Sequence, residues 1–208
     1  MKEKFLILLA GPPCTGKTYL LDLLKEHLEE IFVITPDEVK IDFAEKYGFC
    51  NKEEKRRLEV EKVWPFYYHI LEQYMYAWKK VIVSEYPFSD KQKERIANFS
   101  EKYGYHVITI RLQADFDILW QRRYQRDRRP DRHLSLIMTH YHYGDELEDR
   151  NLADDHITRQ QFHQIIEDRQ YNHFQLGELF KVDVTDFSKV DYAPLLRHLC
   201  THIFTKNK

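Results

Sequence analysis

The sequence FLILLAGPPCTGKT, residues 5–18, specifies the first strand and the loop around which the rest of the chain is organised. Its first half, Phe5–Ala10, is an uninterrupted apolar run, typical of strands that are buried on both faces. Its second half, Gly11–Thr18, has the spacing G-x-x-x-x-G-K-[ST], and leucines at four-residue intervals follow it as one helical stripe. A strand, this loop and an amphipathic helix, in that order, predict a phosphate-binding loop, or P-loop.

The chemistry of the loop explains its residue types. Glycine lets the backbone curl so that successive N–H groups point at phosphate oxygens, and the helix N-terminus adds partial positive charge. Lys17 is expected to reach the β- and γ-phosphates of ATP, and the Thr18 hydroxyl to coordinate Mg²⁺. An accidental glycine-rich turn before a structural helix is the alternative, and the correct flanking elements argue against it. The residues expected to bind the nucleotide are Gly11, Pro12, Pro13, Cys14, Thr15, Gly16, Lys17 and Thr18.

Cys14 lies inside this loop, close to the expected helix N-terminus, where the pKa of a thiol can be lowered. The alternative interpretation is a small residue that fits the turn and has no chemical role. The other two cysteines, Cys50 and Cys200, are far apart, so the sequence predicts neither a disulfide framework nor a metal cluster.

Length and composition favour one folded domain. The chain has 208 residues, of which 43% are hydrophobic and 32% charged, so we expect a single domain over 1–208. The net charge of −2 provides no overall attraction to nucleic acid or to an anionic membrane. No apolar run is long enough to span a membrane, so we expect a cytoplasmic protein without a membrane partner. Nucleic acid stays open as a partner but is not favoured.

Short runs rich in β-branched and aromatic residues predict the strands, and helical spacing occurs between them. The stretch 51–79 is helical throughout, and Pro65 is expected to divide it into two helices. Strands that alternate with helices predict an α/β fold with a parallel sheet and helices on both faces. The predicted strands are Phe5–Ala10, Phe32–Thr35, Val81–Ser84, His106–Leu112 and Phe180–Val184.

Capping residues predict where several helices begin. Thr35–Glu38 has the pattern of a capping box with proline at the first helical position. Ser89–Gln92 is a second capping box, and its helix is expected to end at Gly104. Asp115 and Asp186 are expected to cap the helices that follow them.

Two charged residues follow the second predicted strand, at the sheet edge where open α/β folds bind ligands. Asp37 and Lys40 are three residues apart in the first turns of a helix, so they share one face. The Asp37 carboxylate is a candidate to accept the proton of an attacking hydroxyl, and Lys40 to hold an anionic group of the acceptor. The helix dipole alone also favours an acid in a first turn, and position does not decide between these explanations for Asp37.

Two further acidic segments end strands at the same edge. Glu85 ends the third predicted strand, which suits a carboxylate that holds Mg²⁺ through water. The alternative is an acid that simply faces solvent. Asp183–Asp186 closes the fifth predicted strand, and the loop after it is expected either to contact the base or to be an ordinary strand end.

Arginines are concentrated between Arg122 and Arg132, after the fourth predicted strand. Phosphoryl transfer needs positive charge around the γ-phosphate, and Pro130 forces part of the run out of a helix. We therefore predict an arginine-bearing lid over approximately 122–145, in which Arg122 stacks on the adenine. The alternative is a solvated basic face that pairs with the acidic run 145–155. The candidates for contact with the transferred phosphate are Arg126, Arg128 and Arg129.

Four pieces of the chain, in order, resemble the small P-loop kinases. These are AAA-type ATP-binding domains that include the kinase domain of polynucleotide kinase, chloramphenicol phosphotransferase and the zeta-toxin kinases. The pieces are the loop Gly11–Thr18, the segment Thr35–Lys40 with its D-x-x-K, the stretch Lys80–Gly104 and the arginine-bearing segment. Polynucleotide kinase is the most similar in pattern, and the resemblance extends over approximately residues 2–130.

The resemblance implies a P-loop NTPase fold whose five-stranded parallel sheet has the order 2-3-1-4-5. It implies that Asp37 acts as general base and that Lys40, where the family normally has arginine, binds a substrate phosphate. It also implies that Glu85 takes the place of the family's aspartate at the end of the third strand. A lysine lacks the bidentate geometry with which arginine binds phosphate, so the sequence departs from the family at Lys40.

These observations together predict an ATP- and Mg²⁺-dependent kinase that transfers the γ-phosphate of ATP to a hydroxyl. The predicted catalytic residues are Lys17, Asp37, Arg126 and Arg129. The acceptor is either a small molecule or a polynucleotide 5′-end, and the acidity of the chain favours a small molecule. The alternative is a nucleotide-binding switch that hydrolyses or senses ATP without an acceptor. No convincing N-K-x-D guanine motif occurs, which argues against a GTPase of that type.

Overall fold

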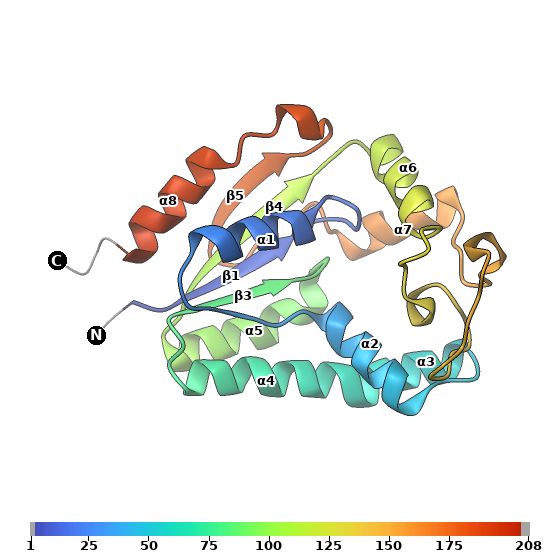
Figure 1. Ribbon diagram of the computed structural model, residues 1–208. Coiled ribbons are helices and arrows are strands. Elements are labelled where there is room, and N and C mark those ends of the chain that lie inside the picture. The colour runs from blue at the N-terminus through green and yellow to red at the C-terminus, as the bar shows by residue number, and fades with distance from the viewer. Residues whose placement is uncertain (1–2, 205–208) are drawn as a thin grey trace.

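The computed structural model describes residues 3–204. Its centre is a five-stranded parallel sheet in the order β2-β3-β1-β4-β5, with helices on both faces (Figure 1). The predicted P-loop fold and strand order are confirmed. The strands are β1 (Phe5–Ala10), β2 (Ile31–Val33), β3 (Val81–Glu85), β4 (His106–Gln113) and β5 (Glu178–Asp183). The helices are α1 (Lys17–His27), α2 (Pro36–Tyr47), α3 (Lys52–Leu58), α4 (Trp64–Tyr76), α5 (Asp90–Tyr103), α6 (Phe116–Arg126), α7 (Arg159–Arg169) and α8 (Ala193–Phe204).

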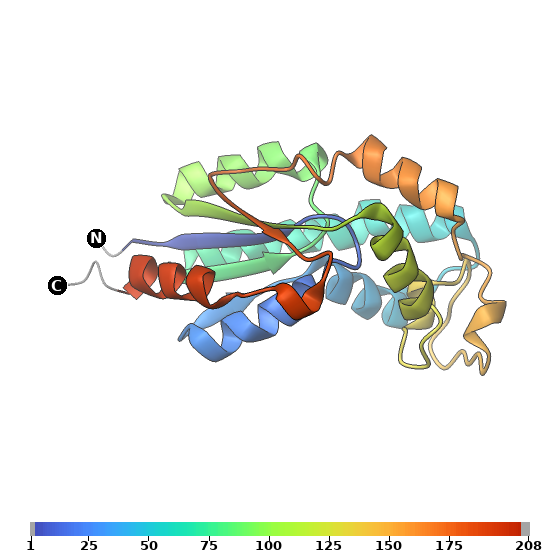
Figure 2. The same cartoon turned by 90° about the horizontal axis from the view of Figure 1, so that it is seen from above.

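The strand β1 is buried on both sides, which explains its unbroken apolar sequence. Phe5, Ile7 and Leu9 pack with leucines of α1 and α8 on one face. The alternate residues of β1 pack with aromatic and aliphatic residues of α4 and α5 on the other face. Figure 2 shows the two helical layers on opposite sides of the sheet. Because all strands are parallel, their carboxyl ends meet at one edge, and the P-loop follows β1 there.

The capping residues act largely as predicted. Thr35 ends β2 earlier than expected because its hydroxyl accepts the Glu38 N–H at 3.4 Å and so begins α2. The Gln92 side chain accepts the Ser89 N–H at 3.0 Å, and α5 ends at Gly104. Asp115 is the N-cap residue of α6, as predicted, but its side chain makes no capping hydrogen bond.

The stretch 51–79 is mostly helical and its regular α-helix is interrupted near Pro65, as predicted, but the interruption is a π-helical turn and not a break. A π-helical turn, Glu59–Val63, joins α3 to α4 without a break. The Trp64 N–H donates to the Glu59 carbonyl, five residues back, and Pro65 follows in the first turn of α4. The wider turn accommodates a proline that an uninterrupted α-helix would exclude.

The C-terminal third differs most from expectation. Asp186 caps a short 3₁₀ turn, Phe187–Lys189, by accepting the Ser188 N–H at 3.1 Å, and α8 begins only at Ala193. The polar helix α7 was not predicted, because only a narrow apolar face, around Phe162, packs against α6. None of the helices within residues 3–204 is long and apolar enough to cross a membrane.

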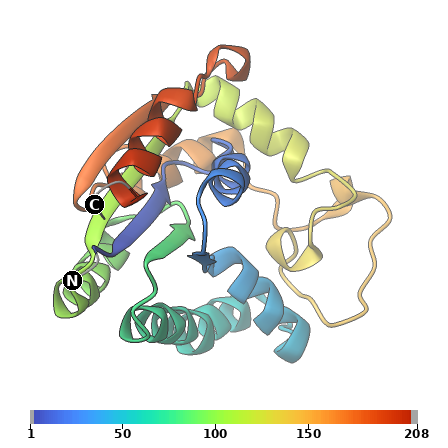
Figure 3. The same ribbon diagram turned by 60° about the vertical axis from the view of Figure 1, so that its left-hand side comes forward.

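The segment 127–158 is mostly irregular and lies beyond the carboxyl edge of the sheet, beside α2 and α6 (Figure 3). Its apolar residues form a cluster with Ala44 of α2 and with Phe49. Phe49 and Tyr141 exchange backbone hydrogen bonds of 2.8 Å, and the Tyr141 hydroxyl donates to Glu45. The segment therefore packs on α2 and forms a wall next to the P-loop.

Two glycines outside the P-loop provide a matched test of the packing. Both have a positive φ, but a Cβ on Gly177 would lie 2.0 Å from the Val107 carbonyl oxygen, whereas one on Gly104 meets nothing within 4 Å. Gly104→Ala should cost about 1 kcal/mol through backbone strain alone. We expect Gly177→Ala to lower the free energy of unfolding by at least about 2 kcal/mol more, because β4 and β5 must also separate.

Urea denaturation of both variants measures the difference. Equal loss of stability would show that β5 does not approach β4 as closely as described.

Candidate functional site

A cavity of about 640 Å³ lies at the carboxyl edge of the sheet. It is bounded by the P-loop, the start of α2, the end of β3, α6 and part of the 127–158 segment. Several predicted site residues from distant parts of the sequence line it. They are Pro13, Cys14, Gly16, Lys17, Thr18, Asp37, Lys40, Glu85, Arg122 and Arg126.

The P-loop curls around the amino group of Lys17. This group donates hydrogen bonds to the carbonyl oxygens of Pro12 at 2.8 Å and Gly11 at 3.2 Å, and the Thr15 hydroxyl donates to Pro12 at 3.0 Å. Burial lowers the pKa of Lys17 to about 8, although the carboxylate of Glu85 opposes this effect. Lys17 therefore stabilises the conformation of the loop. The protonation state of its amino group is sensitive to its surroundings.

The pKa of Cys14 is raised, not lowered. Burial raises the pKa of its thiol, and this effect outweighs the neighbouring positive charges of Arg126 and Arg123. Its backbone lies in the left-handed region with φ 70°, as the curl of the loop requires. The structure therefore supports the alternative, a small residue that fits the loop, and a neutral thiol is a poor nucleophile.

Thr18 and Glu85 lie together, although 67 residues separate them. The Thr18 hydroxyl donates to Glu85 Oε1 at 3.0 Å. Burial raises the pKa of Glu85, and Lys17 and the Thr18 hydroxyl oppose it. These two hard oxygen ligands fit Mg²⁺, which takes few protein ligands and completes its shell with water and phosphate oxygens. Within residues 3–204 there is no cluster of three or more acidic, histidine or cysteine side chains that would hold a metal by itself.

Asp37 lies next to Lys40 on one face of α2, as predicted. Asp37 Oδ1 is 3.5 Å from Lys40 Nζ, and the Asp37 side chain is 53% exposed to the cavity and solvent. Burial lowers the pKa of Lys17 and of Arg132, and the negative charge of Asp37 partly opposes this effect at both cations. Asp37 is therefore the carboxylate that borders both the P-loop and the α2 side of the cavity.

Three arginines converge on the buried carboxylate of Asp127. Arg126 donates to Asp127 Oδ1 through two nitrogens, at 3.0 and 2.9 Å. Arg123 Nε lies 3.2 Å from Oδ2, and Arg132 Nε lies 3.5 Å from Oδ1. One carboxylate therefore faces three guanidinium groups, and this cluster keeps excess positive charge beside the P-loop. Burial raises the pKa of Asp127, but the arginines, Arg126 most strongly, bring it below its usual range.

The three arginines predicted to contact the transferred phosphate do not all lie at the cavity. Arg126 lines the cavity, whereas Arg128 and Arg129 are not among the residues that line it. Arg129 is 63% exposed and forms a two-fold ion pair with Asp131 at 2.9 and 2.7 Å. Arg128 stacks on Tyr124. Sequence analysis did not single out Arg123 and Arg132, because which residues of an arginine run turn inward depends on the fold of the following segment.

Arg122 borders a second part of the site, between α6 and the loop after β5. Its guanidinium stacks on the ring of Phe187 at 3.6 Å and donates to the Thr185 carbonyl at 2.9 Å. The adjoining cavity of about 470 Å³ includes Asp186 and Gln121. Phe187 also approaches the P-loop, because a Cβ on Gly16 would lie 3.2 Å from its ring. Phe187 was not identified from the sequence. An aromatic residue in the loop after β5 could have indicated a base-binding position, because flat rings favour stacking with a base.

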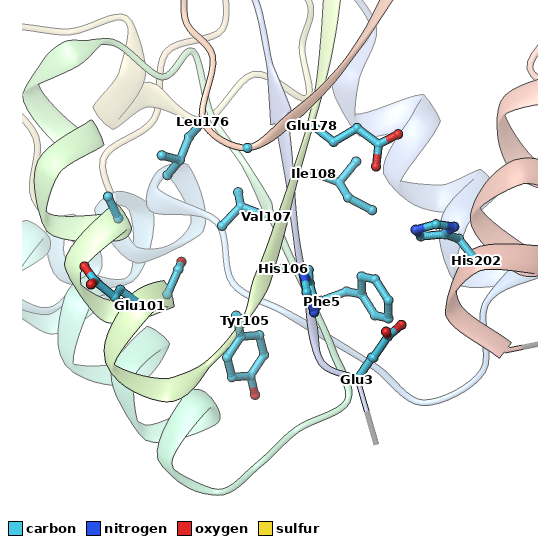
Figure 4. Close-up of a pocket in the computed structure, with 13 residues that line it drawn as sticks. Glu3, Phe5, Glu101, Tyr105, His106, Val107, Ile108, Leu176, Glu178 and His202 are labelled. Atoms are coloured by element: carbon cyan, nitrogen blue, oxygen red, sulfur yellow. The ribbon is translucent and has the colours of Figure 1, made fainter. Parts of the chain in front are cut away.

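Another cavity, of about 460 Å³, lies at the opposite edge of the sheet. Figure 4 shows Phe5 and His106, which begin β1 and β4, and Glu178, which begins β5, around it. It lies at the amino ends of the strands and contains no P-loop residue. It is therefore separate from the phosphate-binding site.

Comparison with known proteins identifies the family. The family model described as AAA domain matches residues 7–139, which include the P-loop, α2, β3 and the arginines of α6. The search of curated proteins finds no match.

Three solved structures share the fold over nearly the whole chain. A candidate kinase from Chloroflexus aurantiacus has a TM-score of 0.73 and 24% identity, covering 97% of this chain and 99% of its own. A gluconokinase from Sinorhizobium meliloti has a TM-score of 0.53 and 12% identity over 100% of both chains. The tunicamycin resistance protein of Deinococcus radiodurans has a TM-score of 0.51 and 16% identity, covering 97% and 96%. The match over residues 7–139 shows that this chain belongs to the AAA domain family, and the solved structures share its fold.

Proposed function

We propose that the protein transfers the γ-phosphate of ATP to a hydroxyl group of an acceptor. One observation carries the proposal: the P-loop, the carboxylate of Asp37 and the arginine cluster around Asp127 all border the same cavity. A protein that only binds nucleotide needs the P-loop but does not need a carboxylate placed across the cavity from it. Phosphoryl transfer needs both, together with concentrated positive charge.

The nucleotide would occupy the P-loop and the cleft beside α6. Lys17 would leave the carbonyl oxygens of Pro12 and Gly11 and contact the β- and γ-phosphates. Thr18 and Glu85 would hold Mg²⁺, which neutralises phosphate charge when it is bound. The base would lie near Phe187 and Arg122, where stacking is available on a flat surface.

Transfer then follows from the position of Asp37. Asp37 accepts the proton of the acceptor hydroxyl as its oxygen forms a bond to the γ-phosphorus. The bond between this phosphorus and the β–γ bridging oxygen breaks, and ADP leaves with the electron pair. The products are ADP, the phosphorylated acceptor and one proton, which Asp37 releases to solvent.

The arginines would stabilise charge that spreads over the transferred group. Arg126, Arg123 and Arg132 are candidates because they line the cavity, and we propose Arg123 and Arg132 in place of Arg129. Asp127 would act as a positioning residue that orients these guanidinium groups before ATP arrives. Preorganised charge of this kind is more effective than charge that must reorganise during the reaction.

Two substitutions test the proposed function directly. Asp37→Asn should leave ATP binding within about two-fold of wild type but lower transfer by at least about 100-fold, because the base is lost. Lys17→Ala should remove both ATP binding and transfer. Transfer of labelled γ-phosphate is measured with a panel of acceptors: a 5′-hydroxyl oligonucleotide, gluconate and tunicamycin.

The panel includes the compounds that the names of two structural neighbours suggest. Full activity of Asp37→Asn with any acceptor would contradict the assignment of the base. Binding of ATP without transfer to any hydroxyl would favour a nucleotide-dependent switch instead.

The pKa of Lys17 predicts how ATP affinity depends on pH. Lys17 loses its proton above about pH 8 in the free protein, whereas bound phosphates favour the protonated form. Binding above pH 8 must therefore take up a proton, and the Kd for ATP should rise by up to about ten-fold per pH unit. Calorimetry in buffers of different ionisation enthalpy measures this uptake. An affinity independent of pH, with no proton uptake, would contradict the prediction.

Asp127→Asn tests the positioning role. Loss of the carboxylate should release the three arginines and lower kcat by about 10- to 100-fold. The KM for ATP should not rise, because the cluster becomes more positive. Asp127→Glu, which keeps the charge, should recover part of kcat and serves as the matched control. A rise in KM with unchanged kcat, or equal loss in both variants together with a lowered melting temperature, would indicate a purely structural role.

A further inference from the structure

The amino group of Lys40 is already surrounded by acidic and phenolic oxygens. It lies 3.5 Å from Asp37 Oδ1 and 3.7 Å from Glu59 Oε1, and it donates to the Tyr86 hydroxyl at 3.1 Å. Its side chain is only 16% exposed. Two carboxylates therefore balance one ammonium group. An anionic ligand at this position would have to displace these partners and would meet their negative charge.

The next cation along this side of the cavity is also paired. Lys55 Nζ lies 2.8 Å from Asp155 Oδ2 and donates to the Met138 carbonyl at 3.0 Å, which ties α3 to the 127–158 segment. Lys52 binds the other oxygen of Asp155 at 2.9 Å. Lys55 thus serves as a structural connection and is not available as a second point of attachment for an anion.

The rest of this wall holds one further acid, Glu38, and otherwise uncharged side chains. Ile41, Pro87, Leu136 and Tyr86 line the cavity beside Lys40. The P-loop side is different, because three arginines there share the single carboxylate of Asp127. The cavity therefore has one half with excess positive charge and one half in which lysines are neutralised by carboxylates.

We propose that the phosphoryl acceptor is a hydroxyl compound that carries no phosphate or carboxylate group, and that Lys40 positions Asp37, Glu59 and Tyr86 instead of binding an anion. This inference rests on the proposed kinase function and deepens it by naming a class of acceptor. It differs from the role that the family resemblance assigns to Lys40, and the contact with Glu59 is the observation that separates the two.

The physical reason is the balance of charge and geometry at Lys40. A phosphate bound to Lys40 would compete with two carboxylates for the same ammonium group and would meet their negative charge at short range. A lysine also binds phosphate through a point charge and lacks the two-pronged geometry of arginine. A neutral acceptor avoids this competition and can place its hydroxyl against Asp37 while its apolar part contacts Ile41 and Leu136.

Inorganic phosphate is the probe that tests this inference. The protein is first saturated with Mg²⁺ and a non-hydrolysable ATP analogue, so that the P-loop and the arginines are occupied. Phosphate is then titrated by calorimetry into wild type, Glu59→Gln and the double variant Lys40→Gln/Glu59→Gln. Wild type should show no saturable binding with a Kd below about 1 mM. Glu59→Gln should bind phosphate at least about ten-fold more tightly, because Lys40 loses one counter-charge, and the double variant should lose this gain.

Saturable binding by wild type below about 1 mM would overturn the inference, and so would the absence of any gain in Glu59→Gln. Binding of the ATP analogue is measured separately, with Lys17→Ala as control. Failure of the analogue to bind would contradict the proposed kinase function, whereas the phosphate titration reports only on the acceptor half. The two failures are therefore distinguishable.

Discussion

The close approach of β1 and β4 at their carboxyl ends is the constraint on which the site depends. A Cβ at Gly11 would lie 2.0 Å from the carbonyl oxygen of Leu112, and φ at Gly11 is 110°. Only glycine fits this combination of contact and conformation. The chain can therefore turn out of the sheet immediately after Ala10, and Lys17 begins α1 directly above the strand ends. A larger residue would clash with Leu112 and push the start of the loop away from β4.

The two sides of the cavity differ in charge. The side proposed to bind ATP has excess positive charge, and the side proposed to bind the acceptor does not. ATP brings several negative charges, and the side that would receive them holds Lys17 and the cluster of Arg123, Arg126 and Arg132 with its single carboxylate. The other side holds cations that are each matched by acids. Net charge is −2 for the whole chain, so this division is local and is invisible in the overall composition. It arises because α6 and the loop after it supply arginines, whereas α2 and the π-helical turn supply acids.

The sequence predicted the fold well because the strongest local signals coincide with it. Gly11–Thr18 has both a required spacing and required neighbours, and β1 has no polar residue to make its burial ambiguous. Glu85 and Asp37 were also identified, since both follow strands at the edge where parallel strands end. Arg126 was identified, whereas the inward-facing Arg123 and Arg132 and the ring of Phe187 were not. Their positions depend on contacts between segments that are far apart in sequence, which a one-dimensional pattern does not contain. Cys14 was ambiguous because proximity to a helix N-terminus lowers the pKa of a thiol, whereas burial raises it, and only the structure shows which effect is larger.

The π-helical turn at Glu59–Val63 sets the relative rotation of the two helices that it joins. An α-helix advances about 100° per residue, so one additional residue in a turn rotates everything before it by about that angle relative to everything after it. On one side of the turn, Tyr67 and Leu71 of α4 face the sheet and are fully buried. On the other side, Lys55 of α3 lines the cavity, as does Glu59 at the start of the turn. Deletion of one residue here would leave the apolar face of α4 against the sheet and swing the side chains of α3 away from Lys40. The irregular turn thus sets which side chains of α3 border the cavity while the apolar face of α4 stays packed on the sheet.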